Sequence, residues 1–331
     1  MSISISIGIG PRESLQDWMA FSAELERDGV GETWLIDSQL AMKDVYAGLA
    51  ASALRTERMR LGTGVTNLIS RHPTVTANAI AAIAELSGGR ALLGLGAGDS
   101  AVFGIGARPS RVAEVEAGIR FFRAVLAGEE GEWEGRPFRL AQEVAPTPVY
   151  LAVSRPRMCR LAGRLADGAI LMGPAQPELV ERQVGWVLDG IREAGRARSD
   201  VRIAFIATLS ARADRDAALA DVRSWAVAQA RLQADVDTLP PSLQPFAEEI
   251  ARARSDYDYA EHLSTRAGHQ RVISDDLVRT LAIAGTVDEC LPCAQALLAT
   301  GVDDLIFPLM GRARLERLRV LTQQIAPALR R

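Results

Sequence analysis

Short apolar segments rich in β-branched residues alternate along this chain with longer segments of helical periodicity. This alternation predicts parallel strands joined by helical crossovers. We expect eight strands, at residues 3–9, 31–36, 59–66, 91–96, 149–153, 169–172, 201–209 and 304–308. Helices are expected at 14–27, 45–55, 74–86 and 110–127, after Pro156, and at 314–328, with a β-hairpin at 132–140.

Eight strands in one alternating series predict a closed (β/α)₈ TIM barrel. An open, doubly wound sheet is disfavoured because no dinucleotide-binding glycine motif follows the first strand. About residues 211–280 hold more helix than one crossover needs. We therefore expect a helical insertion between the seventh and eighth strands, as a cap over the barrel mouth or a dimer surface. The whole chain, 1–331, is expected to form a single domain.

The composition is ordinary, with 48% hydrophobic residues, 24% charged residues and a net charge of −3. This balance gives no reason to expect nucleic acid or a membrane as partner. Three cysteines without a disulfide framework indicate a reducing compartment, so we expect a cytoplasmic protein without a signal peptide. Cys290 and Cys293 lie in an apolar helical pattern without a second Cys/His pair, and we expect no metal.

A TIM barrel binds its ligand at the C-terminal ends of its strands. After the fourth strand, Gly96, Ala97 and Gly98 allow the backbone to approach a ligand, and Asp99 places a carboxylate at the rim. The alternative is a glycine-lined turn that Asp99 caps. Asp37 and Ser38 follow the second strand and are acid/base or orienting candidates, or loop caps.

Two further strand ends carry candidate chemistry. Gly62 and Gly64 weaken the third strand and indicate a bulge or a close backbone approach, with Thr66 and Asn67 as polar contacts at the rim. His72 follows as a base or, more simply, a local hydrogen-bonding group. After the fifth strand, a helix is expected to start at the segment Val153, Ser154, Arg155 and Pro156. Its free N–H groups and arginines could bind a phosphate. The alternative is that Ser154 caps the helix and the arginines are solvated.

These segments together resemble the bacterial luciferase-like superfamily of flavin and deazaflavin oxidoreductases. The most specific stretch runs from Gly62 to Asp99 and includes G-T-G-V-T-N, R-H-P-T-V-T-A-N-A-I and L-S-G-G-R-A-L-L-G-L-G-A-G-D. Further matches are D-S-Q-L at 37–40, V-Y-L-A-V-S-R-P at 149–156, L-A-G-R-L-A-D-G-A-I-L at 161–171 and G-T-V-D-E-C at 285–290. The resemblance is strongest to the branch that uses coenzyme F420, and within it to methylenetetrahydromethanopterin reductase.

The resemblance implies a bulged third strand with a non-prolyl cis peptide, here Gly64–Val65, behind the cofactor ring. It implies that Gly96–Asp99 meets the ring edge with Asp99 near the reactive carbon, and that Ser154 and Arg155 meet the cofactor tail. It also implies a homodimer that forms through barrel helices. The reductase has a glutamate where this chain has the segment 7–10, a histidine where it has Ser38, and a glycine where it has Arg155.

We therefore expect F420-dependent hydride transfer to or from a small, unsaturated organic substrate, with Asp37, Ser38 or Asp99 orienting it or relaying a proton. The alternative is a monooxygenase that uses reduced FMN. A flavin-binding protein without turnover is a third hypothesis. A TIM-barrel hydrolase or lyase is disfavoured, because no convergent His/Asp/Glu metal set or Ser-His-Asp arrangement is evident.

Overall fold

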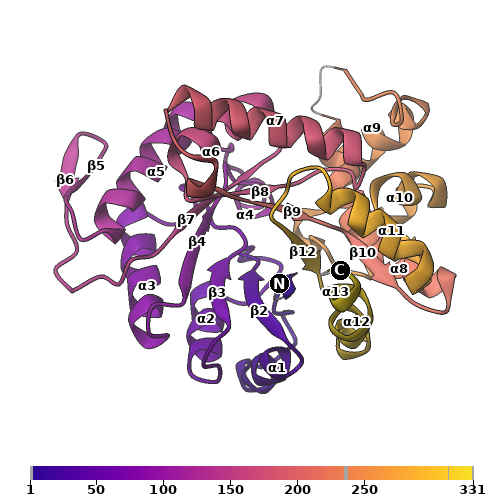
Figure 1. The fold of residues 1–331 in the computed structure, drawn as a ribbon, viewed down its shortest axis with the longest axis horizontal. Coiled ribbons are helices and arrows are strands. Elements are labelled where there is room, and N and C mark those ends of the chain that lie inside the picture. Colours follow the sequence, from indigo (N-terminus) through magenta and orange to yellow (C-terminus); the bar gives the residue numbers. More distant parts are fainter. Residues whose placement is uncertain (1–2, 235–237, 312, 330–331) are drawn as a thin grey trace.

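Eight parallel strands close into a barrel in the computed structural model, which describes residues 3–234, 238–311 and 313–329 (Figure 1). The barrel order is β1-β12-β9-β8-β7-β4-β3-β2. Closure depends on β1, which pairs with β2 on one side and with β12 on the other. The strands are β1 (Ile3–Ile7), β2 (Val30–Leu35), β3 (Arg60–Thr63), β4 (Ala91–Leu95), β7 (Val149–Val153), β8 (Gly168–Leu171), β9 (Arg202–Ile206) and β12 (Asp304–Pro308). The predicted TIM barrel is confirmed.

Helices surround the barrel and begin where the sequence supplies caps. Ser14 and Asp44 accept hydrogen bonds from the first turns of the helices they precede, and Pro73, Pro156 and Pro177 begin three others, where a missing N–H costs little. The outer helices are α1 (Leu15–Arg27), α2 (Val45–Ala53), α3 (Pro73–Leu86), α5 (Val112–Leu126), α6 (Pro156–Leu165), α7 (Pro177–Glu193), α11 (Val287–Leu298), α12 (Arg314–Val320) and α13 (Ala326–Leu329), with a π-helical turn at Leu321–Ile325.

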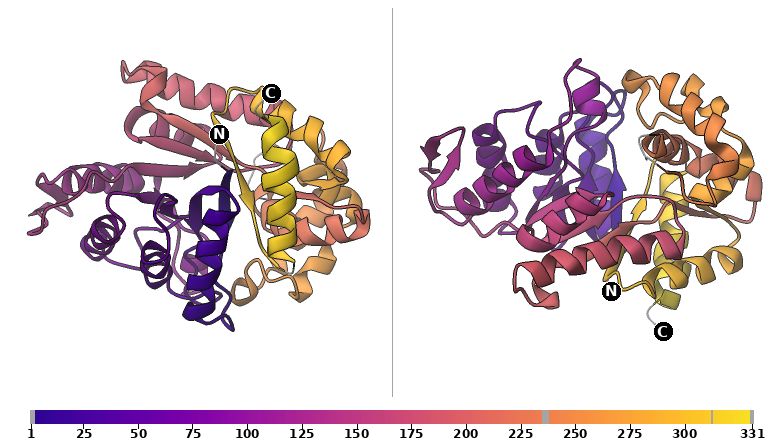
Figure 2. Two further views of the ribbon diagram at one scale, coloured as in Figure 1. Left: turned by 60° about the horizontal axis from the view of Figure 1, so that its bottom comes forward. Right: turned by 90° about the horizontal axis from the view of Figure 1, so that it is seen from above.

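The first and the last helices among the described residues meet on the outside of the barrel. Figure 2 shows the C-terminal helices beside α1, and Arg314 joins them by an ion pair with Glu13 at 2.7 Å and by packing over the ring of Phe21. The first and last strands are adjacent, so this contact holds the barrel closed from its outer face.

A buried polar network lies at the N-terminal ends of the strands, opposite the predicted site. Glu32, 1% exposed, accepts hydrogen bonds from Ser4 at 3.0 Å, from the indole of Trp34 at 2.8 Å and from Arg202 at 2.6 Å. Arg202 also pairs with Asp304. Burial opposes the charge on Arg202, but Glu32 and Asp304 together raise its pKa above the ordinary value. Four strands are thus joined by charge-assisted hydrogen bonds.

The seventh strand of the sequence prediction is two strands in the structure. β9 ends at Ile206, and β10 (Leu209–Ala211) leaves the barrel to pair in parallel with β11 (Ile283–Gly285), a strand that the sequence analysis did not predict. Between them lie α8 (Arg215–Gln233), α9 (Ala247–Ser255) and α10 (Asp275–Leu281). The hairpin is confirmed as β5 (Gly131–Trp133) and β6 (Arg136–Phe138), and a short helix not predicted, α4 (Ser100–Phe103), follows β4.

Candidate active site

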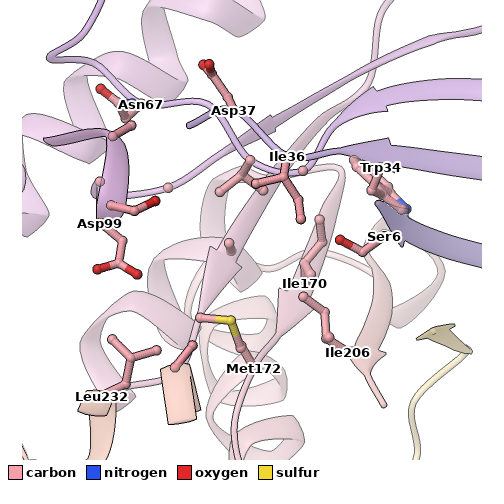
Figure 3. A pocket seen from close by; sticks show the side chains of 18 of the residues that line it. Ser6, Trp34, Ile36, Asp37, Asn67, Asp99, Ile170, Met172, Ile206 and Leu232 are labelled. Carbon is pink, nitrogen blue, oxygen red and sulfur yellow. The ribbon is translucent and has the colours of Figure 1, made fainter. Parts of the chain in front are cut away.

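A cavity of about 260 Å³ lies above the C-terminal ends of the strands. Trp34, Ile36, Ile170 and Ile206 form its aliphatic and aromatic floor, and Figure 3 shows these side chains to the right of Asn67 and Asp99. Helix α8 and the segment around His262 form the facing wall. The cavity therefore lies between barrel and insertion, where TIM barrels bind ligands.

One wall of the cavity is a bulge that begins where β3 ends. The peptide bond between Gly64 and Val65 is cis, as the resemblance implied. The Thr66 N–H donates to the Gly94 carbonyl, and the Gly96 N–H donates to the Thr66 carbonyl, both at 2.9 Å. Gly64, Val65 and Thr66 all line the cavity. The sequence analysis extended the third strand through this bulge because periodicity alone does not register it.

The glycines of these strands give room to bulky neighbours. A Cβ on Gly62 would lie 2.6 Å from the ring of Trp34, and one on Gly94 would lie 2.1 Å from the Thr63 carbonyl oxygen. A Cβ on Gly96 would meet Val65 at 2.9 Å. Gly98 has a φ of +103°, a conformation that side chains rarely adopt. These glycines are thus required by close packing around the bulge and the Gly96–Asp99 loop.

Asp37 lines the cavity, but its carboxylate is hydrogen-bonded to protein side chains. The same oxygen accepts hydrogen bonds from Thr66 at 2.8 Å and from Arg71 at 2.6 Å, and Arg71 also binds Asp44 at 2.9 Å. Figure 3 shows the Asp37 carboxylate pointing away from the floor of the cavity. Asp37 is therefore placed to fix the bulge through Thr66.

Ser38 is buried and does not line the cavity. Its hydroxyl shares a 2.9 Å hydrogen bond with Ser100, which does line it. The structure thus places Ser38 one residue behind the surface where a ligand would lie. His72 also lies away from the cavity and caps α3 through a hydrogen bond from the Thr74 N–H.

Asp99 lines the cavity and pairs with a buried arginine of α8. Its Oδ2 lies 2.5 Å from Arg231, whose side chain is fully buried and stacks over the rings of Tyr257 and Tyr259. Burial disfavours the charge on Arg231, but Asp99 and the tyrosines raise its pKa above the ordinary value. The other Asp99 oxygen, Oδ1, is buried with no hydrogen-bond partner among the described residues. A buried acceptor without a partner is unusual in proteins, so a ligand that moves this side chain could satisfy it.

His262 lines the cavity from the insertion, and the sequence analysis did not select it. Its Nδ1 shares a 2.7 Å hydrogen bond with the hydroxyl of Tyr257, while Nε2 makes no hydrogen bond to a described residue. Burial lowers the pKa of His262 to about 4, so the imidazole is neutral at pH 7. The histidine shows no motif spacing, so only the fold brings it to the site.

This lowered pKa predicts how stability depends on pH. Between pH 6.5, the ordinary pKa, and pH 4, unfolded chains bind a proton at His262 that folded chains do not. The stabilisation is therefore complete above pH 6.5 and is lost as the pH falls through 4. Urea unfolding across this range is expected to show a smaller loss of unfolding free energy for His262→Asn than for wild type. His72→Asn, at an exposed capping position, should follow wild type; equal slopes for all three proteins would contradict the assignment.

The residues at the end of the fifth barrel strand line two different cavities. Val153 and Ser154 line the first, whereas Arg155 lines a second cavity of about 290 Å³ together with Arg182 and donates to the Leu232 carbonyl at 2.9 Å. Both cavities share Ser154, Met172, Gln229 and Leu232, so they are contiguous. Pro156 starts α6 and lines neither. Asn67, Ala97 and Gly98 line the first cavity, as the remaining predicted binding residues.

One face of α8 also lines the first cavity, which the sequence did not predict. Trp225, Ala228, Gln229 and Leu232 recur at the spacing i, i+3, i+4, i+7 and line the first cavity together. This spacing places side chains on one helix face. The periodicity was present in the sequence, but nothing in it indicated that the face covers the barrel mouth.

A closed eight-stranded barrel with a cavity at its C-terminal face and a bulged third strand behind that cavity defines a ligand-binding TIM-barrel protein. The chain belongs to the luciferase-like monooxygenase family, whose model matches residues 2–304. Family membership is thereby confirmed.

Known relatives indicate which branch of the family this chain resembles. The chain is 30% identical to 5,10-methylenetetrahydromethanopterin reductase of Methanolobus tindarius, over 85% of this chain and 86% of that protein. It is 28% identical to F420-dependent glucose-6-phosphate dehydrogenase of Nakamurella multipartita, over 85% and 81% respectively. The coenzyme F420-dependent tetrahydromethanopterin reductase of Methanopyrus kandleri has the same fold, with a TM-score of 0.79, 22% identity and coverage of 99% of this chain and 100% of that one. The predicted resemblance to F420-dependent oxidoreductases is confirmed. No helix in the described ranges is long and apolar enough to cross a membrane.

Proposed function

We propose that this protein is an F420-dependent oxidoreductase that transfers a hydride to or from a small organic substrate. The relatives named above support this assignment, and one observation of the molecule carries it. The bulge at Gly64–Thr66 and the loop at Gly96–Asp99 border one apolar cavity, which Asp99 also lines. This arrangement suits a flat, largely apolar ring with a few polar edge atoms.

The residues present fit the cofactor. Gly64, Val65 and Gly96 would hold the ring, because all three line the cavity and a side chain on Gly96 would occupy the space between Val65 and Ala152. The phosphate-bearing tail would continue into the contiguous second cavity, where Arg155 and Arg182 supply positive charge. Ser154 lies at the junction of the two cavities.

Bound there, F420 supplies two-electron chemistry, in which a hydride passes between cofactor and substrate carbon while a proton moves on or off the neighbouring substrate heteroatom. Asp37 would fix the bulge through Thr66 and would not take part in proton transfer, because Arg71 holds its carboxylate. Asp99 would border the ring edge in the cavity, with Arg231 fixing the orientation of its carboxylate. Walls of α8 would exclude water from the reacting atoms.

Titration of the purified protein with F420 and with FMN, each oxidised and reduced, tests this function. We expect F420 to bind in the micromolar range or tighter. We expect FMN to bind at least tenfold more weakly, because its shorter tail would leave more of the second cavity unfilled. Oxygen consumption that depends on reduced FMN would contradict the proposal and establish the monooxygenase alternative, which the family's description favours. Binding without turnover of any acceptor would leave a flavin-binding protein.

We also propose a homodimer that forms through α2 and α3. Val75, Leu86 and Leu54 are 55%, 44% and 63% exposed on these neighbouring helices, and Ala79 and Ala82 continue the same face of α3 with small side chains. Light scattering is expected to give the mass of a dimer. Val75→Glu should give a monomer, whereas Glu85→Ala on the same helix should not; a monomeric wild-type protein would contradict this surface.

Residues 1–331 are proposed to form one domain that includes the insertion at about 211–280, since α8 packs against both β10 and β11 at the insertion's ends. A single unfolding transition is expected, and two separate transitions would contradict it. We propose the cytoplasm as the compartment, because Cys159, Cys290 and Cys293 are all unpaired, and cell fractionation tests this.

A further inference from the structure

The first cavity has no positive charge on its described walls. No lysine or arginine is among the described residues that line it, and its two carboxylates, Asp37 and Asp99, are both paired with arginines that lie outside the lining. A phosphate or carboxylate on a substrate would therefore find no cationic side chain in the lining to pair with. Burying an unpaired anion is costly, so anionic substrates are disfavoured in this chamber.

The chamber suits a substrate with an apolar body. Ile36, Ile170, Ile206 and Met172 converge on its floor (Figure 3), and Ile306 is buried beside them. Aliphatic walls of this kind stabilise an apolar ligand by removing its surface from water. They offer nothing to a polyhydroxylated ligand such as a sugar, whose hydroxyls would lose hydrogen bonds to water.

One polar group on the facing wall is held ready for a substrate atom. His262 uses Nδ1 to bond Tyr257, and Tyr257 is itself fixed by stacking on His269 at 4.3 Å and beneath Arg231 at 4.7 Å. Nε2 of His262 is left to donate to a carbonyl oxygen or to accept from a hydroxyl, according to tautomer. An alcohol and its ketone can both use this group, as a reversible hydride transfer requires.

We propose that the substrate is a small, uncharged alcohol or ketone whose apolar body lies in the isoleucine-lined chamber and whose oxygen bonds Nε2 of His262. The inference rests on the proposed function. When a hydride from reduced F420 forms the new C–H bond, the C=O π bond breaks, the oxygen takes a proton from solvent, and the oxidised cofactor releases its own proton to solvent. Nε2–H of His262 would stabilise the negative charge on oxygen, and alcohol oxidation is the reverse. The inference separates this chain from the relatives named for glucose 6-phosphate and methylenetetrahydromethanopterin. His262 is thus assigned as a catalytic residue that touches substrate.

The test compares two probes that share a ketone and differ in charge: methyl levulinate and levulinate. Binding to the F420-loaded protein is measured by saturation-transfer NMR, and turnover by the oxidation of reduced F420. We expect the neutral ester to bind and to have a kcat/KM at least tenfold above that of the anion. Equal or better use of levulinate, or no binding of the ester, would overturn the inference.

Two substitutions at one position test the role of His262. Asparagine places an amide at the position of Nδ1 and lacks Nε2, so His262→Asn should lower kcat/KM for the ester about tenfold, with the affinity for F420 unchanged. Glutamine reaches the position of Nε2, so His262→Gln should restore most of that loss. His72→Asn, at an exposed histidine that caps α3 and does not line the cavity, is the matched control. An unchanged kcat/KM for His262→Asn would overturn the inference, whereas failure of the wild-type protein to bind F420 would overturn the proposed function itself.

Discussion

Ala152→Phe is expected to weaken F420 binding by about a hundredfold or more, equivalent to ~2.7 kcal/mol. Ala152 lies on β7 with its side chain directed to the barrel interior, and it lines the cavity. Its Cβ is 3.9 Å from the point where a side chain on Gly96 would begin. A phenyl group there would fill the space beside Val65 that the cofactor ring needs. The change in F420 fluorescence on titration measures the loss.

The matched control is Ala220→Phe, because Ala220 lies on α8 with its side chain exposed to solvent. Both variants are expected to melt within a few degrees of wild type, so a folding defect is distinguished from a blocked site. Unimpaired F420 binding by Ala152→Phe, in a protein that is folded, would place the cofactor somewhere other than this cavity.

Arg202→Met is expected to destabilise the fold by about 3–5 kcal/mol, the largest stability effect that the structure predicts for one residue. Arg202 is the shared partner of Glu32 and Asp304, which are 1% and 3% exposed at the N-terminal end of the barrel. Removing the guanidinium leaves the buried carboxylate of Asp304 without a cationic partner, beside Glu32, which keeps its ion pair with Arg60. Burial already raises the pKa of Asp304, so part of the loss will appear as its protonation.

Urea unfolding at neutral pH measures this effect, and Arg215→Met is its control. Arg215 also pairs with a carboxylate, that of Glu289, but both side chains are largely exposed, and no measurable change in stability is expected. A loss for Arg202→Met as small as that for Arg215→Met would show that the network does not hold the barrel floor together. Replacing the whole buried group by nonpolar side chains, in Glu32→Met, Arg202→Met and Asp304→Met, should recover part of the lost stability, because Arg60 is 42% exposed and can stay in water.

The barrel and the bulge could be predicted from the sequence, because each depends on residue patterns within short segments. Strand residues such as Ile3–Ile7 and Val149–Val153 carry continuous β-branched or aliphatic patterns, and Gly62 and Gly64 interrupt such a pattern where the structure bulges. The short strand β10 was merged with β9, because two residues between strands are too few to break an apolar run. Asp37, Asp99 and Ser154 reach the cavity because strand ends of a parallel barrel meet at one face.

The residues that the insertion contributes to the cavity could not be predicted from the sequence, for a physical reason. Trp225 and His262 are far from the strand ends in sequence, and only the packing of α8 across the barrel mouth brings them to the cavity. Arg231 likewise meets Asp99 across 132 residues. Ser38 and Pro156 were selected because they follow strand ends. In the structure Ser38 lies behind Ser100 and Pro156 is the first residue of α6, so neither lines the first cavity.

The central claim is that the bulge and the Gly96–Asp99 loop bind a tricyclic cofactor ring. A crystal structure of the protein grown with oxidised F420 tests it most directly. The account predicts ring density in contact with Val65 and Gly96, and tail density beside Arg155. Density for the ring anywhere else, or a cavity filled by protein side chains in the presence of saturating F420, would contradict it.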